Sequence, residues 1–276
     1  MPVELRSTGI LHSILNSLYT LYFIPYTVLM TNPMSTKIIK SLHQKKYRQE
    51  TKKFLVEGTK NVAELLRSDF KIDNVYITAE FKKNYGELLL SRKDVRIQLV
   101  DGAELNSFGT LEHNDGALAI AIQKDYKKPL NSDGIILALD DIRDPGNLGT
   151  LIRIADWYGI KHIVCSAMCV DWYNPKVINS SMGSFTRVEG HYTDLPVYLR
   201  DQKVAKLGSF LEGSSVHSFK FPKSGILIVG SESHGISKEV GKCVTEKITI
   251  PSFGKAESLN AAIAGAIILD RWKGSL

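Results

Sequence analysis

The sequence predicts an α/β protein made of two units, and three observations support this. Continuous apolar runs recur in the second half of the chain and alternate with helical stretches, which is typical of a doubly wound sheet whose parallel strands are buried on both faces. Shorter strand and helix patterns in the first half indicate a smaller α/β unit. Residues 123–133, between the two, are polar and rich in turn formers, so the domain boundary is expected there.

The first 33 residues are expected to form an extension that is non-native or disordered. Residues 10–30 contain no charged side chain, but polar residues dilute the segment and Pro25 interrupts it. It is therefore a poor membrane span, and the lack of a small-residue cleavage site makes it a poor signal peptide. Met34 opens the next segment as a natural start would. A peripheral membrane anchor is the alternative, and no membrane partner is expected.

Positive charge is concentrated at the start of the first unit, residues 34–122. The 276 residues have a formal net charge of +6, and residues 34–72 alone hold ten Lys and Arg against four acidic residues. Ile38, Ile39 and Leu42 fall at helical spacing among lysines, which predicts a short helix with a basic face. A polyanionic partner suits this charge, although a solvated charged face explains it equally simply.

Regular elements are expected in both units from hydrophobic periodicity. In the first unit we expect a helix at 61–66 and strands at 54–56, 74–78, 95–100 and 117–122. In the second unit, residues 134–276, we expect helices at 148–157 and 259–272 and strands at 134–139, 162–164, 225–229 and 247–250.

Three polar corners follow strands of the second unit. In the first, residues 141–149, we expect Asn147 to cap a helix and Gly149 to allow a close approach of the backbone to a ligand. Arg153 would project from that helix. It could instead pair with a nearby carboxylate, and the residues alone leave both readings open. The acidic candidates are Asp140, Asp141 and Asp156.

The second corner, residues 230–237, combines a bare glycine backbone with the carboxylate of Glu232, while His234 is expected to face solvent. In the third, Ser258 is the expected N-cap of a long helix and Asn260 would present its amide in the first turn. Because the carboxyl ends of parallel strands meet at one edge of a sheet, the three corners are expected to converge on one site.

The sequence lacks the motifs that usually identify several classes of protein. Cys165, Cys169 and Cys243 form neither a CxxC pair nor an even disulfide framework, and no histidine cluster lies near them in the sequence. We therefore expect a reducing compartment and no metal. There is no GxGxxG, P-loop or GxSxG pattern, which argues against a Rossmann NAD enzyme, a nucleotide triphosphatase and a serine hydrolase.

The order and spacing of the three corners resemble the SpoU/TrmH family of RNA methyltransferases across residues 134–273. The matching residues are Asn147, Gly149, Arg153, Gly230, Glu232, Gly235, Ser237, Ile250, Pro251, Ser258, Leu259 and Asn260. Residues 174–184 are similar to the intermediate helix of the family, except that Asn179 stands where a basic residue is expected. The resemblance implies an α/β domain at 134–276 whose C-terminal part threads into a trefoil knot.

The resemblance also implies methylation of a ribose 2'-hydroxyl in structured RNA with S-adenosylmethionine. The cofactor would be held at Gly230, Gly235, Ile250 and Leu259. Arg153 would activate or orient the hydroxyl; since a guanidinium stays protonated, polarising the hydroxyl or clamping a phosphate is easier than acting as a base. Supporting catalytic roles would fall to Asn147, Glu232, Ser258 and Asn260.

The first unit resembles the substrate-binding module of the family, an L30e-like ribosomal-protein fold, through residues 54–58 and the basic lead-in at 45–48. Members with this module are similar to ribosomal RNA modifiers more than to tRNA modifiers. The candidate RNA contacts are Lys45, Lys46, Arg48 and Lys53. The resemblance further implies a homodimer formed through the knot region, which suits the small apolar residues of 261–268. A cytoplasmic location is also expected. A catalytically silent RNA-binding or ribosome-assembly factor on the same fold is the alternative.

Overall fold

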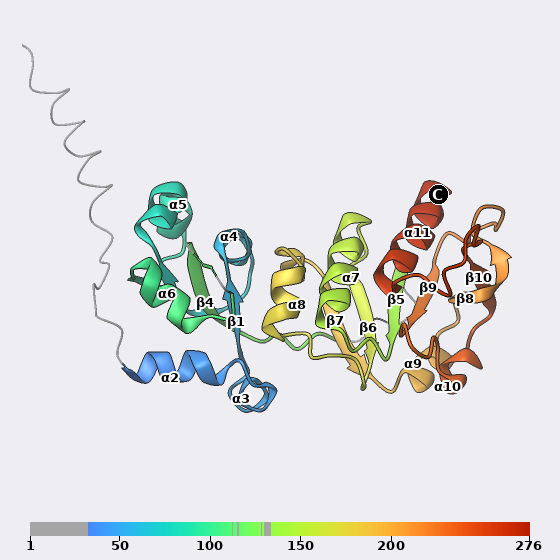
Figure 1. Ribbon diagram of the computed structural model, residues 1–276, viewed down its shortest axis with the longest axis horizontal. Helices are drawn as coiled ribbons and strands as arrows, with labels where there is room; N and C mark the ends of the chain where they lie inside the picture. Colours follow the sequence, from blue (N-terminus) through green and yellow to red (C-terminus); the bar gives the residue numbers. More distant parts are fainter. Residues whose placement is uncertain (1–32, 112, 115, 128, 130–133) are drawn as a thin grey trace, which may run out of the picture.

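Two α/β domains lie side by side along the long axis of the molecule in the computed structural model (Figure 1). It describes residues 33–276 except 112, 115, 128 and 130–133. The extension expected at residues 1–33 thus lies, apart from Pro33, outside the described residues, as do five positions of the expected linker. Among the helices described, none is long and apolar enough to cross a membrane.

The sheet of the first domain has the strand order β1-β4-β2-β3. β4 lies between β1 and β2 and is antiparallel to both, whereas β3 pairs in parallel with β2. The four strands are β1 (Lys53–Glu57), β2 (Ile72–Ile77), β3 (Arg96–Leu99) and β4 (Ala117–Ile122). The strands expected in this domain are confirmed to within two residues at each end.

Helices cover both faces of this sheet. They are α2 (Pro33–Ser41), α3 (Lys45–Thr51), α4 (Thr59–Arg67), α5 (Ala79–Ser91) and α6 (Gly102–Phe108). Successive side chains of a strand point to opposite faces, so Phe54 joins the core under α4 and α5 while Leu55 packs with α2 and α6. The single basic helix expected after Met34 is in fact two, because Gln44 is extended between α2 and α3.

The second domain has a parallel sheet with the order β10-β8-β9-β5-β6-β7. Its strands are β5 (Ile135–Asp140), β6 (His162–Ser166), β7 (Glu189–Thr193), β8 (Lys206–Ser215), β9 (Gly225–Gly230) and β10 (Glu246–Thr249). The four expected strands are confirmed. The sequence prediction missed β7 and β8, because β7 is a polar edge strand and β8 is partly exposed and rich in Gly and Ser. Neither strand therefore contains a continuous apolar run.

Helices α7 (Pro145–Trp157), α8 (Pro175–Ser180) and α11 (Ala261–Gly274) cover one face of this sheet. Helices α9 (Leu195–Asp201) and α10 (Lys238–Gly241) cover the other. The side chains of Leu137 and Leu139 on β5 point to the first layer, and that of Ala138 to the second. Both faces of the central strands are therefore buried, as the continuous apolar runs predict.

The two domains share a continuous apolar core. α8 lies against β1 and stands between the two domains in Figure 1. The ring of Phe54 on β1 is 4.4 Å from that of Tyr173 and 6.0 Å from that of Phe185, measured between centroids, and Phe70 also contacts Phe185. Such aromatic contacts stabilise the packing beyond the area that they bury, so the orientation of the first domain is set by packing as well as by the linker.

Polar contacts also cross the domain boundary, and one of them corrects a prediction. Arg48 was expected to contact RNA, but its side chain is buried and forms an ion pair with Asp171 at 2.6 Å. Its guanidinium also donates hydrogen bonds to the carbonyl oxygens of Leu42 and His43. Arg48 therefore joins the domains and is removed from the candidate RNA contacts.

The unexpected Asn179 also has a place at this boundary, where its side-chain oxygen accepts a hydrogen bond from Asn61 at 3.4 Å. Nearby, Arg187 bridges Glu64 of the first domain and Asp156 of the second, at 2.5 and 2.8 Å. The position that departs from the family pattern thus contacts the neighbouring domain.

Candidate functional site

The first corner leads from β5 into α7. Asp144 caps α7 by accepting a hydrogen bond from the backbone N–H of Asn147 at 2.8 Å, and Pro145 occupies the first helical position. The prediction that Asn147 is the N-cap is therefore wrong, because the helix begins two residues earlier than that residue. As a consequence, the side-chain amide of Asn147 does not cap the helix and can form hydrogen bonds with residues of the other two corners.

Gly149 permits a close contact, although with a different partner from the one expected. A Cβ atom at this position would lie 2.5 Å from the Cβ of Ser180 and 2.7 Å from the carbonyl oxygen of Val177. Both residues lie in α8, which packs against α7. The glycine thus allows two helices to approach each other, and a role in ligand contact is not needed to explain it.

The second corner is a tight turn at the end of β9. Ser231 and Gly235 exchange two backbone hydrogen bonds, at 3.1 and 2.9 Å. Gly235 has a φ of +65°, which favours glycine. A Cβ atom on Gly230 would lie 2.1 Å from the carbonyl carbon of Gly235. The turn is also tied to the end of β5, just before the first corner, because Asp140 accepts a hydrogen bond from the N–H of Ser237 at 2.8 Å.

The third corner ends at the N-terminus of α11. The side-chain oxygen of Asn260 accepts hydrogen bonds from the N–H groups of Ala262 and Ile263, at 2.9 and 3.3 Å. Asn260 is therefore the N-cap, and the prediction that Ser258 has this role is wrong by two residues. Asparagine and serine are both favoured caps, so local preference alone does not choose between them.

Three of the five predicted catalytic residues form one hydrogen-bonded network, and each comes from a different corner. The amide nitrogen of Asn260 donates to the side-chain oxygen of Asn147 at 2.8 Å. The amide nitrogen of Asn147 in turn donates to Glu232, which lies 3.5 Å from the amide nitrogen of Asn260. The convergence expected from the sequence is thus confirmed for these three side chains.

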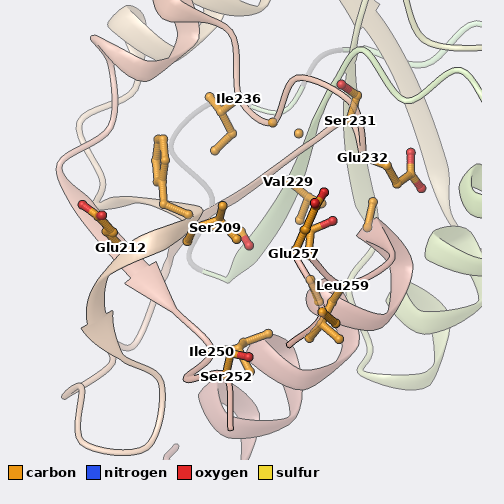
Figure 2. A pocket seen from close by; sticks show the side chains of 18 of the residues that line it. Ser209, Glu212, Val229, Ser231, Glu232, Ile236, Ile250, Ser252, Glu257 and Leu259 are labelled. Atoms are coloured by element: carbon orange, nitrogen blue, oxygen red, sulfur yellow. The ribbon is translucent and has the colours of Figure 1, made fainter. Parts of the chain in front are cut away.

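A pocket of about 830 Å³ opens beside this network, between the second and third corners (Figure 2). All four predicted cofactor-binding residues line it, and so do two of the predicted catalytic residues. They are Gly230, Gly235, Ile250 and Leu259, together with Glu232 and Ser258. The volume falls within the range of about 300–1,000 Å³ found for small-molecule sites.

Sequence reasoning missed the wall of the pocket formed by β8. Ser209 and Glu212 of this strand line the pocket, on the side away from Glu232 (Figure 2). Only the parallel pairing of β8 with β9 and β10 brings these residues to the site. His234 also lines the pocket and is exposed, and its ring contacts the hydroxyl of Ser233 at 2.7 Å.

Arg153 is exposed on α7, and its guanidinium has no ion-pair or hydrogen-bond partner among the described residues. The three carboxylates that could have paired with it contact other groups. Asp140 binds the N–H of Ser237, Asp141 pairs with Arg143, and Asp156 pairs with Arg187. The ion-pair alternative is therefore wrong for Arg153, which lies about 9 Å along the helix from Asn147.

The remaining candidate RNA contacts differ in exposure. Lys45 and Lys46 are exposed on α3. Lys53 is half-buried and forms an ion pair with Asp73 at 2.5 Å. The two lysines of α3 are therefore the candidates whose charge is open to a partner.

The two central cysteines are buried, as expected for small apolar residues at a strand end. The Sγ of Cys169 accepts a hydrogen bond from the N–H of Ile142 at 3.3 Å, which places it under the first corner. A hydrogen bond from Cys165 lowers the pKa of Cys169, whereas the same contact, together with burial, raises the pKa of Cys165. Both thiols are enclosed by the fold and belong to its core.

The chain combines a small-molecule pocket at the carboxyl ends of a parallel sheet with a second domain that carries a basic segment, an arrangement that suits an enzyme acting on a nucleic acid. Residues 134–270 match the SpoU rRNA methylase family, and residues 34–119 match the MRM3-like substrate binding domain. The 23S rRNA (guanosine(2553)-2'-O)-methyltransferase of Bacillus subtilis is 30% identical, over 85% of this chain and 94% of its own length. The chain belongs to the SpoU rRNA methylase family.

Solved structures agree with this assignment. An AdoMet-bound rRNA methyltransferase from Sinorhizobium meliloti has a TM-score of 0.79 and 27% sequence identity, covering 91% of this chain and 98% of its own. A SpoU methyltransferase from Streptomyces viridochromogenes, also in complex with AdoMet, has a TM-score of 0.78 at 22% identity and covers 88% of this chain and 98% of its own. The second likeness shows the fold alone.

Proposed function

We propose that this protein transfers a methyl group from S-adenosylmethionine to a ribose 2'-hydroxyl of ribosomal RNA. The observation that carries the proposal is the Asn260–Asn147–Glu232 network at the edge of the pocket. It places polar groups from three corners beside a cavity of the size that a nucleoside cofactor needs. The relatives support the substrate, since the Bacillus subtilis enzyme methylates a 2'-oxygen of 23S rRNA and the Sinorhizobium meliloti enzyme binds AdoMet.

The pocket residues fit S-adenosylmethionine. Val229, Ile250 and Leu259 offer apolar surface to a planar base, and the bare backbone at Gly230, where a side chain cannot be accommodated, can approach the polar edge of a ligand. When bound, the cofactor supplies an electrophilic methyl group on a sulfonium. The chain has to bind it, exclude water and align the target hydroxyl with that methyl group.

In the transfer, the hydroxyl oxygen would gain the methyl group, the sulfonium would leave as a neutral thioether, and the hydroxyl proton would pass to solvent water. Arg153 stays protonated, so its proposed role is to polarise the hydroxyl or to clamp the neighbouring phosphate. Asn147, Glu232 and Asn260 position the reacting groups through their shared hydrogen bonds. Ser258 lines the same pocket and would complete the polar side.

RNA would be held by the first domain, with Lys45 and Lys46 on α3 supplying phosphate contacts. The match of residues 34–119 to a substrate-binding domain supports this role. The name of the Bacillus subtilis relative favours rRNA over tRNA. Lys53 would contribute less, because Asp73 already neutralises its charge.

A homodimer belongs to the same proposal. Trp157 of α7 is 84% exposed, and Ile263 of α11 is 50% exposed. These helices pack against each other, so their exposed apolar side chains offer a surface to a second copy of the chain. Arg153 projects from the same helix as Trp157. The trefoil knot and the cytoplasmic location stay predictions.

The test is methyl transfer from labelled S-adenosylmethionine to RNA from a strain lacking this gene, including rRNA, tRNA and assembling ribosomal subunits. We expect label at one ribose of rRNA. Arg153→Ala should bind the cofactor as the wild type does and lose transfer, whereas Lys83→Ala, at an exposed lysine of α5, should retain it. Cofactor binding without transfer to any of these RNAs would instead support a silent RNA-binding factor.

A further inference from the structure

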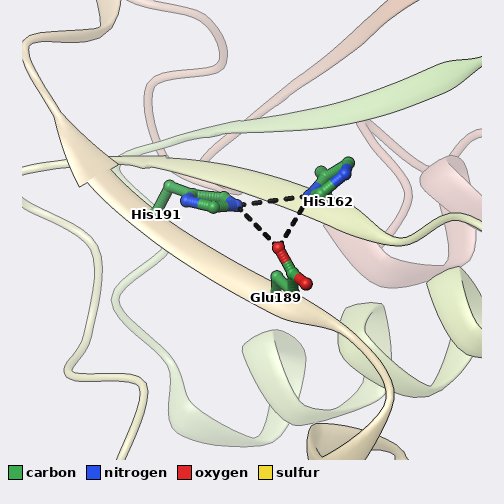
Figure 3. A group of neighbouring side chains, drawn as sticks. All are labelled: His162, Glu189 and His191. Atoms are coloured by element: carbon green, nitrogen blue, oxygen red, sulfur yellow. Dashed lines mark hydrogen bonds and ion pairs between the residues drawn. The ribbon is translucent and has the colours of Figure 1, made fainter. Parts of the chain in front are cut away.

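A second cluster of functional side chains lies at the opposite edge of the large sheet from the pocket. His162 at the start of β6 and Glu189 and His191 on the edge strand β7 point towards one another (Figure 3). We infer that these three side chains bind a divalent transition-metal ion, with zinc as the best fit. No local pattern indicates this cluster, because the two histidines lie 29 positions apart in the chain.

The distances between the candidate ligand atoms suit a tetrahedral ion. Nδ1 of His162 lies 3.2 Å from a carboxylate oxygen of Glu189 and 3.4 Å from Nε2 of His191, which is 3.9 Å from the same carboxylate oxygen. Zinc binds nitrogen and oxygen at about 2.0–2.2 Å, so neighbouring ligands of a tetrahedral zinc stand roughly 3.4 Å apart. Two of the observed separations, 3.2 and 3.4 Å, are close to that value, and the third, 3.9 Å, is longer.

The pairing of the strands produces this geometry. β6 and β7 are parallel, with His162 beside Glu189 and Val164 beside His191. Because alternate residues of a strand share a face, all three side chains project on one face of the sheet. His191 is buried and the other two are partly exposed, which leaves a fourth position open to water or a further ligand.

The donor set also selects the type of ion. Two imidazoles and a carboxylate suit zinc and its transition-metal neighbours, whereas magnesium and calcium prefer oxygen ligands alone. Without an ion, the two facing ring nitrogens of the histidines must share one proton or separate. Bound zinc would satisfy both nitrogens and the carboxylate together.

The position indicates a structural ion. The pocket lies at the β8–β10 side of the sheet, whereas β7 is the other edge strand. The ring of Tyr126, in the segment between the domains, packs edge-on to His191, with 6.0 Å between the centroids. A metal here would hold β7 to β6 and support the interdomain segment, and methyl transfer would not pass through it.

The experiment uses the full chain after chelator treatment and desalting, titrated with zinc alone and followed by calorimetry and thermal unfolding. Cobalt(II) is the spectroscopic probe and magnesium the negative control. The variants are His162→Asn and Glu189→Gln, both at partly exposed positions, and His191→Asn. The matched control is His217→Asn, because His217 is exposed and outside the cluster.

We expect one zinc per chain, a tetrahedral cobalt spectrum and a rise in melting temperature with zinc. Each cluster variant should weaken zinc binding by about 100-fold or more, since loss of an outer-shell partner alone costs about 10–100-fold, and His217→Asn should bind as the wild type does. Absence of one-to-one zinc binding by the wild type, or unchanged binding by His162→Asn and Glu189→Gln, would overturn the inference.

Discussion

The side chain of Asn260 caps α11 with its oxygen and donates to Asn147 with its nitrogen, at 2.8 Å. One amide thus joins the start of the last helix to the first turn of α7. Glu232 completes the network from the turn after β9. The three corners are therefore held in register by groups at the edge of the pocket.

The two roles of Asn260 can be separated by substitution. Asn260→Ala removes both, so we expect methyl transfer to be lost and the free energy of unfolding to fall by about 1 kcal/mol, the usual cost of losing an N-cap. Asn260→Ser keeps a capping oxygen and lacks the amide donor. It should retain stability and still lose transfer. Normal transfer by Asn260→Ser would show that the contact with Asn147 does not position the reacting groups.

A substitution of Gly230 tests the proposal that S-adenosylmethionine binds in the pocket. In Gly230→Ala the added methyl group would lie 2.1 Å from the carbonyl carbon of Gly235, so the turn after β9 has to move. We expect S-adenosylmethionine to bind at least about tenfold more weakly, a change of about 1.4 kcal/mol, measured by calorimetry. Gly241→Ala is the control, because a Cβ atom there meets nothing within 4 Å. Equal affinities for the two variants would argue against a backbone contact at Gly230.

Substitution of Arg48 tests whether its ion pair with Asp171 stabilises the packing of the two domains. Arg48→Ala leaves Asp171 without its ion-pair partner and removes the donors to two carbonyl oxygens. We expect a loss of about 3–5 kcal/mol in stability, measured by urea unfolding. The double variant Arg48→Met, Asp171→Leu should lose less, because it leaves no unpaired charge. Lys45→Ala, on the exposed side of α3, should keep its stability, and an equal loss there would contradict the assignment.

Tyr198 makes the stability of the protein depend on pH in the alkaline range. Burial raises the pKa of Tyr198 to about 12, against about 10 in an unfolded chain. Because the folded state holds the phenol proton more tightly, this contribution to stability is complete below about pH 10 and is lost as the pH rises through about 12. The hydroxyl donates to the carbonyl oxygen of Pro129 at 2.9 Å.

In Tyr198→Phe, the free energy of unfolding should therefore fall less between about pH 9 and about pH 11 than in the wild type, by on the order of 1 kcal/mol. Denaturant unfolding at the two pH values measures this. Loss of the hydrogen bond to Pro129 lowers the free energy of unfolding equally at the two pH values. The difference between them therefore reports the titration of the Tyr198 hydroxyl. The same decrease in both proteins would assign the alkaline dependence to other groups.

Short-range patterns predicted the elements of the fold better than the helix ends or the roles of single side chains. The run at 117–122 was found with the same bounds, because an apolar segment between turn formers has few alternatives. The caps were misplaced, since Asn147 and Ser258 have the right chemistry but lie three and two residues from the true N-caps, Asp144 and Asn260. Arg48 was misassigned because its burial depends on Asp171, far away in the chain.

The sequence by itself determined the α/β class, the buried central strands and the three polar corners, because hydrophobic period and turn chemistry act over a few residues. Only the tertiary structure decided which of these residues meet. The network at Asn260, the β8 wall of the pocket and the cluster at His191 each depend on strand pairing between distant segments. Such pairing is chosen by the packing of the whole chain, so no local pattern encodes it.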